Sequence, residues 1–176
     1  MTTEPALDVV GFDRTEDGFD RLDQLVDIAR STLLGEDVVR GRLDLVAVDP
    51  EEMARLNLEH LGHDGPTDVL SFPLDVVAGP DGGGPDDELH LDFGDDGDGP
   101  PPHLGDVVLC PVVAREQAPG HCGTEQAELA LLVIHGVLHV LGHDHAEAEE
   151  TARMRDRERL HLAALGFPHP GPAVRP

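Results

Sequence analysis

The sequence predicts a single α+β domain, in which a small β-sheet packs against helices. Some stretches are apolar or partly alternate between apolar and polar residues, as strands do, and others repeat apolar residues every three or four positions, as helices do. The chain has 176 residues, a length that suits one domain with a proper core. The predicted order of strand, helix, strand, helix, strand, strand and then helices indicates an α+β fold.

The predicted elements follow one another along the chain. In order, they are a strand at 6–12, a helix at 17–34, a strand at 43–48, a helix from 50 to about 61, a strand at 67–74, a strand at 104–110, a short helix from 111 to about 118, a helix from 124 to about 141, and a helix at 147–165. Pro50 is typical of a first helical turn, and Gly35 ends the first helix. Thr124 is a good N-cap for the long apolar helix.

One long stretch is predicted to be a flexible insertion within a domain that spans residues 1–167. Of the 28 residues in 75–102, 20 are Asp, Gly or Pro, so the stretch has too little apolar surface to offset the entropy of ordering. Within it, only Glu88–Phe93 is predicted to form a short strand. Residues 168–176 are predicted to be a disordered tail.

The charge is strongly acidic. Twelve basic residues, all of them arginine, stand against 36 acidic ones, which gives a net charge of -24. Proteins that bind nucleic acid usually carry a basic surface, because phosphate contacts dominate their affinity. We interpret the excess acid as a solvated, salt-adapted surface, on which any RNA site has to be a local positive patch.

Hydropathy and cysteine content point to a soluble cytoplasmic protein. No apolar run approaches the length of a membrane span, and the acidic N-terminus lacks the basic start of a signal peptide. Cys110 and Cys122 do not make a disulfide framework. Cys110 is predicted to be buried, and for Cys122, beside His121, a metal role is the lesser alternative.

Histidines near the end of the long apolar helix predict a metal site. His135 and His139 are four residues apart, so both project from one face of the helix. Gly142 can end the helix in the left-handed conformation and let the chain fold back with His145. Three imidazoles leave one position of a tetrahedral ion open for water, which is typical of a catalytic site. The alternative is a histidine-rich tract without function.

The chemistry of three imidazoles leaves some assignments open. Imidazole suits zinc, copper, nickel and iron. A metal bound in this way lowers the pKa of its water and polarises a phosphoryl oxygen. Asp144 is not needed as a ligand, and it either orients an imidazole, acts as a base, or only caps the turn. We predict His135, His139, His145 and Asp144 as the catalytic residues and the three histidines as the metal ligands.

Three motifs stand out along the chain: Gly65-Pro-Thr-Asp-Val-Leu-Ser-Phe-Pro73, Leu104-Gly-Asp-Val-Val-Leu-Cys110 and His135-Gly-x-Leu-His139-x-x-Gly142-x-Asp144-His145. In order and approximate spacing they resemble the motifs of the YbeY family, bacterial metal-dependent endoribonucleases of rRNA maturation. The resemblance extends from about Leu43 to Phe167. It implies a mixed sheet with a central metal-bearing helix, a zincin-like arrangement.

The resemblance also implies a function. The expected activity is single-strand-specific endoribonuclease action in the maturation of the 16S rRNA 3′ end and in ribosome assembly or quality control. The expected cofactor is one zinc ion, with no organic cofactor, and the expected partners are single-stranded rRNA and the ribosome or its small subunit, with no membrane.

Some residues differ from the family pattern, and two alternative functions are therefore considered. Many members have tyrosine at the position of His143, which in this chain could be a fourth ligand or contact RNA. Many also have arginine at the position of Leu61. A non-catalytic ribosome assembly factor with a structural metal is therefore one alternative. A zinc peptidase is another, but such enzymes need glutamate after the first histidine, where this chain has Gly136.

Overall fold

The computed structural model describes residues 7–74, 100–143 and 147–170. The strands are β1 (Leu7–Asp13), β2 (Gly41–Ala47), β3 (Val69–Pro73) and β4 (His103–Leu109). The helices are α1 (Leu22–Gly35), α2 (Pro50–Leu61), α3 (Pro111–Gln117), α4 (Glu125–Val140) and α5 (Ala148–Ala164), with a 3₁₀ turn (Ala118–Gly120) between α3 and α4. The strand predicted at Glu88–Phe93 and most of the predicted insertion lie outside the described residues.

The sheet is mixed, as expected. Its strand order is β1-β2-β4-β3, with β1, β2 and β4 parallel and β3 antiparallel to β4. The α+β prediction is confirmed, and β3 is an edge strand whose Ser71 is the register partner of Val107.

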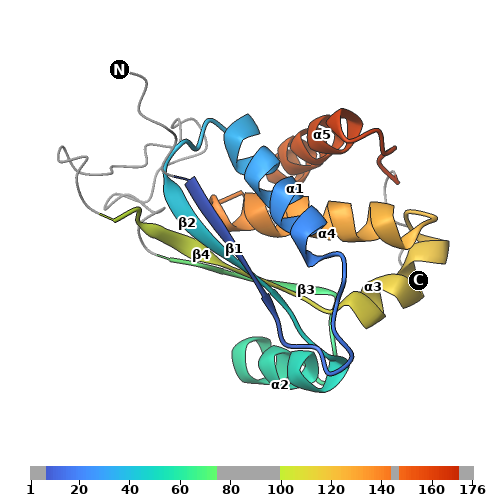
Figure 1. Ribbon diagram of the computed structural model, residues 1–176. Coiled ribbons are helices and arrows are strands. Elements are labelled where there is room, and N and C mark those ends of the chain that lie inside the picture. Colours follow the sequence, from blue (N-terminus) through green and yellow to red (C-terminus); the bar gives the residue numbers. More distant parts are fainter. Residues whose placement is uncertain (1–6, 75–99, 144–146, 171–176) are drawn as a thin grey trace.

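Helices cover the two faces of the sheet unequally (Figure 1). α1 and α4 cover one face and bury the larger core, whereas α2 lies against the other face. α5 packs on the side of α4, where Ile134 and Leu138 meet Met154 and Leu162. This arrangement makes α4 the central helix. Its residues 129–134 are all buried, which agrees with the nearly continuous apolar sequence there.

The first helix begins later than predicted, at Leu22 rather than at residue 17. The Asp13 carboxylate accepts hydrogen bonds from the backbone N–H groups of Phe19 at 2.6 Å and Thr15 at 2.9 Å. These bonds, together with that from the Thr15 hydroxyl, hold the pKa of Asp13 below its usual value. Gly18 adopts a φ of 79° within the same loop. The carboxylate therefore organises a turn where apolar periodicity alone predicted helix.

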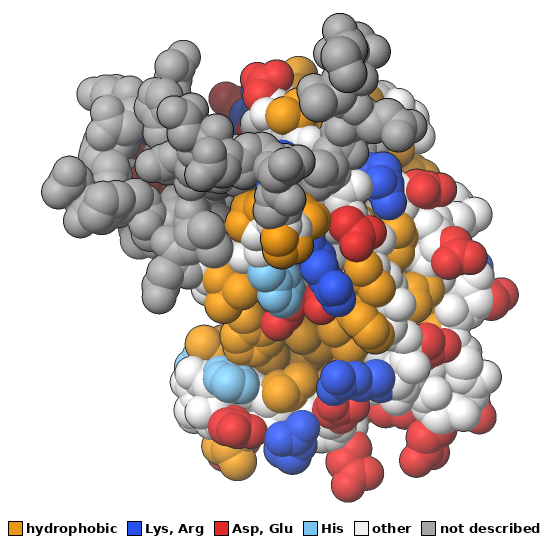
Figure 2. All heavy atoms as spheres, turned by 60° about the vertical axis from the view of Figure 1, so that its left-hand side comes forward, with side chains coloured by type: hydrophobic (Ala, Val, Ile, Leu, Met, Phe, Trp, Pro, Cys, Tyr) orange, Lys and Arg blue, Asp and Glu red, His pale blue; other side chains and the backbone are white. Residues whose placement is uncertain are grey.

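The surface carries both charged and hydrophobic side chains. Figure 2 shows a face on which hydrophobic side chains gather beside acidic, basic and histidine side chains. Of the helices in the described ranges, none combines the length and apolar character that crossing a membrane requires.

Candidate metal centre

Hydrogen bonds define both ends of α4, the helix that carries His135 and His139. Thr124 caps the start, because its hydroxyl accepts a hydrogen bond from the N–H of Ala127 at 3.2 Å. At the other end Gly142 has a φ of 91°, and the N–H groups of Gly142 and His143 donate to the carbonyls of His139 and Leu138. This is the Schellman pattern of helix termination, and it confirms that Gly142 ends the helix.

His135 and His139 face each other on the last two turns of α4. Their Nε2 atoms are 3.1 Å apart, and the rings meet nearly at right angles, with centroids separated by 4.5 Å. Zinc–nitrogen bonds are about 2.0–2.1 Å long, so two nitrogens on one tetrahedral ion lie a little over 3 Å apart. The two imidazoles therefore fit a shared metal ion.

The far nitrogen of His135 is held by a carboxylate that the sequence did not indicate. The Nδ1 atom of His135 lies 2.7 Å from Oε1 of Glu158, which belongs to α5 and is 23 residues further along the chain. With a proton on Nδ1, the neutral imidazole donates a hydrogen bond to the carboxylate, and Nε2 is the unprotonated nitrogen that can bind a metal. Such carboxylate–histidine pairs fix the tautomer and the orientation of metal ligands.

Glu158 is buried and has a second histidine partner. Its side chain is 8% exposed, and its Oε2 atom lies 3.0 Å from Nε2 of His169. Burial by itself raises the pKa of Glu158, but the hydrogen bonds with His135 and His169 outweigh burial, so the pKa is lowered overall. His169 thus packs against the domain, although residues from 168 onward were predicted to be a disordered tail.

Gly136 brings α4 into close contact with the sheet. A Cβ atom at this position would lie 2.6 Å from Cγ1 of Val107 and 3.3 Å from Oγ of Ser71. The glutamate that a His-Glu-x-x-His peptidase carries here would therefore clash with β4. The contact also places Ser71 beside the helix that bears the two histidines.

Thr67 and Asp68 stabilise the start of β3. The Thr67 hydroxyl donates to Asp68 Oδ1 at 3.1 Å, and the same oxygen accepts the N–H of Val69. The Asp68 carbonyl also accepts the N–H of Cys110 at 2.9 Å. These bonds indicate that the two residues stabilise the start of β3 and its contact with Cys110, just after β4.

The remaining predicted site residues are only partly described. Asp144 and His145 lie outside the described residues. His143 is described, and its Nε2 lies 3.6 Å from Oε2 of Glu36, at the end of α1. Burial raises the pKa of Glu36, but hydrogen bonds with His143, His161 and Arg157 lower it far more. His143 is therefore engaged with a carboxylate at the end of α1.

Cys122 lies in a cluster at the start of α4. The buried Glu128 carboxylate is 2.9 Å from Nδ1 of His121 and accepts the N–H of Cys122 at 3.2 Å. The three side chains together could hold an ion. Burial and the nearby Glu128 raise the pKa of the Cys122 thiol to about 12, so the thiol is protonated at neutral pH.

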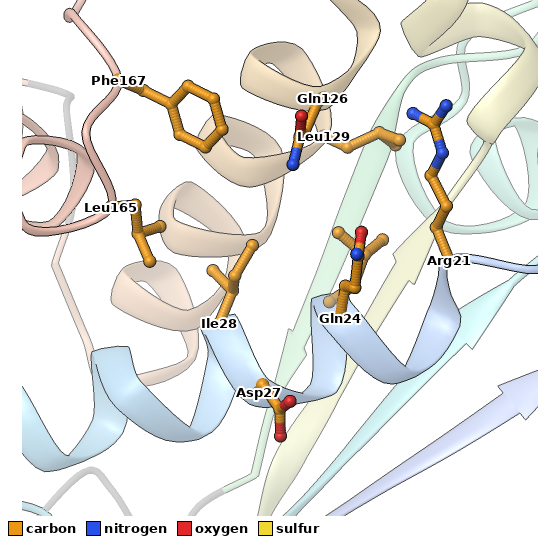
Figure 3. A pocket seen from close by; sticks show the side chains of 9 residues that line it. Arg21, Gln24, Asp27, Ile28, Gln126, Leu129, Leu165 and Phe167 are labelled. Carbon is orange, nitrogen blue, oxygen red and sulfur yellow. The ribbon is translucent and has the colours of Figure 1, made fainter.

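A pocket of about 260 Å³ lies between α1, the first half of α4 and the end of α5 (Figure 3). Arg21, Gln24 and Gln126 give it polar walls, and Leu129 and Phe167 are among its apolar ones. Neither His135 nor His139 lines it. The pocket is therefore separate from the histidine pair.

The fold and the paired histidines define an α+β domain with a candidate metal site on its central helix. The family model described as Endoribonuclease YbeY matches residues 8–166. Over 136 residues the chain is 43% identical to the Endoribonuclease YbeY of Acidothermus cellulolyticus, with 74% of this chain and 75% of that protein covered. For the protein of the same name from Nocardia farcinica, identity is 36% over 179 residues, covering 88% and 91%. The chain belongs to the YbeY family.

A solved structure has the same fold. The solution structure of a Thermotoga maritima protein matches 95% of this chain and 99% of its own, with a TM-score of 0.52 and 22% sequence identity. At this identity the similarity supports the architecture alone.

Proposed function

We propose that this chain is a metal-dependent endoribonuclease that cleaves single-stranded rRNA in the cytoplasm, in 16S rRNA 3′ end maturation and small-subunit assembly or quality control. Family membership supports the nuclease activity. The observation that carries the metal dependence is the His135–His139 pair, whose Nε2 atoms are 3.1 Å apart while Glu158 holds Nδ1 of His135.

We assign the ion as zinc, bound by His135, His139 and His145. When bound at such a site, zinc supplies a water of lowered pKa and polarises a phosphoryl oxygen. The protein's own part is to present unprotonated nitrogens: Glu158 accepts a hydrogen bond from Nδ1–H of His135, which makes Nε2 the ligand atom. Asp144 either acts as a base toward the attacking water or orients an imidazole.

The acidic surface restricts where RNA can bind. Most described arginines are paired with acids: Arg14 and Arg55 with Glu52, Arg42 with Asp44, Arg115 with Glu125, Arg153 with Glu149, Arg157 with Glu36, and Arg159 with Asp156. Binding of phosphate at these arginines has to exchange existing ion pairs, and it should depend strongly on salt.

The test is cleavage of a single-stranded RNA by the zinc-loaded protein over a range of salt, beside His135→Ala. Metal analysis first confirms that only the wild type holds the ion. His63→Ala is the matched control, since His63 is exposed and lies outside α4. Cleavage that disappears with the ion in His135→Ala, and persists in His63→Ala, supports the proposal.

A second candidate function is a ribosome assembly factor that binds a structural metal without cleaving RNA. It is favoured by Leu61, which takes the place of the family arginine and is 55% exposed at the end of α2. A folded, metal-loaded wild type that is inert at every salt, with ribosome association retained in His139→Ala, would support this function over the nuclease.

A further inference from the structure

Two carboxylates lie side by side on the sheet face opposite α4. Asp44 of β2 and Asp106 of β4 are register partners, and their neighbours Val46 and Val108 pack on the α2 side of the sheet. Like charges directly across two strands destabilise a sheet. Arg42 compensates the negative charge of Asp44, because its Nε donates to Asp44 Oδ1 at 2.8 Å. Asp106 faces a histidine instead.

That histidine, His103, is brought to the same face by an irregularity in the sheet. The pairing of β2 with β4 shifts register between Arg42 and Leu43, which lets the first residue of β4 approach Asp106. His103 Nε2 lies 3.0 Å from Asp106 Oδ1 and 3.8 Å from Asp44 Oδ2. Such bulges commonly redirect a side chain next to a functional site.

The facing atoms of His103 and Asp106 do not satisfy each other. Nε2 of His103 and Oδ1 of Asp106 are both shielded from solvent, and neither has a hydrogen-bond partner within the described ranges. At 3.0 Å they are close enough for a hydrogen bond, so the missing bond reflects their direction. Two ligand atoms about 2.0–2.2 Å from one ion lie close to 3 Å apart without pointing at each other.

We propose that Asp44, His103 and Asp106 bind a divalent transition-metal ion, at a site separate from the histidine pair on α4. The three ligating atoms lie within 4.8 Å of one another. One imidazole and two carboxylates suit zinc or manganese better than magnesium or calcium, which prefer oxygen ligands alone. Arg42 orients the Asp44 carboxylate, and the ion ties β2 to β4 where β4 begins.

The proposal is independent of the nuclease function, because it uses no residue of α4. The full-length chain, freed of metal, is titrated with zinc, and bound zinc is measured in the presence of millimolar magnesium. Magnesium saturates nonspecific binding to the acidic surface. The expected result is two zinc ions per wild-type chain. His103→Gln and Asp106→Asn should each bind one, and a His135→Ala/His139→Ala double variant should also keep one.

Asp8→Asn is the matched control. Asp8 is exposed on β1 and is the register partner of Arg42, so this variant removes the same charge from the same face but none of the three ligands. It should still bind two zinc ions. A decrease equal to that of Asp106→Asn would mean that only the charge of the face matters, and it would overturn the proposal.

A second measurement does not depend on variants. Substoichiometric Mn²⁺ added to isotope-labelled wild type should broaden the amide signals of residues 42–46 and 103–107 as early as those around His139. Broadening that spares these strands, together with a His103→Gln protein that binds as much zinc as the wild type, would show a surface ion pair and no metal site. If the wild type binds an ion at Asp44, His103 and Asp106 but none at the histidine pair of α4, the proposed function is refuted and the site on the sheet is supported.

Discussion

Replacement of Glu158 tests the proposed metal site. The carboxylate is buried, and its two oxygens lie 2.7 Å from His135 Nδ1 and 3.0 Å from His169 Nε2. Hydrogen bonds to charged groups contribute about 1.5–3 kcal/mol each. Loss of a partner that orients a metal ligand weakens metal binding by about 10–100-fold. Glu158→Gln keeps an acceptor for the Nδ1 proton but loses the charge, so we expect about a 10-fold loss of zinc affinity.

Glu158→Ala removes the acceptor as well, so its loss of zinc affinity should lie near the 100-fold end. This loss corresponds to about 2.8 kcal/mol, at 1.4 kcal/mol for each factor of ten. Zinc affinity is measured by competition with a chromophoric chelator at neutral pH, after circular dichroism has confirmed the fold. Glu149→Gln is the control, because Glu149 lies on the same helix, its side chain is 90% exposed, and its Oε2 lies 3.7 Å from Arg153 on the surface. Unchanged affinity in a folded Glu158→Ala protein would refute the role of Glu158.

Three further predictions follow from packing, charge and composition. Gly136→Ala should destabilise the fold by about 1–3 kcal/mol in urea unfolding, because the added Cβ would lie 2.6 Å from Val107 Cγ1. Gly120→Ala is the control: a Cβ there would have no described atom within 4 Å, so the substitution should be nearly neutral. The pKa of Glu36 is lowered in the folded protein, so its contribution to stability is complete above the unfolded-state pKa of about 4.3 and is lost as the pH falls below it. In Glu36→Gln the free energy of unfolding should therefore decrease less with falling pH than in the wild type, as measured by urea unfolding at several pH values. Deletion of residues 78–99 should leave the thermal midpoint within a few degrees of the wild type, and a large drop would show that the segment packs.

The central helix could be predicted from sequence because its determinants are local. The apolar run, the Thr124 cap and the Gly142 terminus all lie within twenty residues, and α4 forms with these limits at Glu125–Val140. The later start of α1 was not predicted, because it depends on a hydrogen bond from the N–H of Phe19 to the carboxylate of Asp13. The spacing of apolar residues carries no information about this bond.

The partner of His135 could not be predicted because it depends on how two helices dock. Glu158 lies among arginines and acids in α5, where its sequence neighbours make it resemble a solvated residue. It is buried only because α5 packs along α4. The same docking carries His169 onto the second oxygen. Only its spacing of four residues from both Met154 and Leu162, which puts it on their face of α5, distinguishes this glutamate from the exposed Glu149.

The placement of carboxylates constrains the chemistry of the site. Glu158 contacts Nδ1 of His135, the nitrogen opposite the one that faces His139, so it can orient the imidazole but does not face the space between the two Nε2 atoms. A carboxylate at position 136 is excluded by Val107. Any acid–base group for hydrolysis must therefore come from another segment, and Asp144, four residues after the end of α4, is the carboxylate nearest in sequence to the histidine pair. Glu158 and Asp144 should therefore differ when replaced. Replacement of Glu158, which contacts His135, should lower metal affinity, and replacement of Asp144, which is proposed to move a proton, should lower turnover at saturating metal.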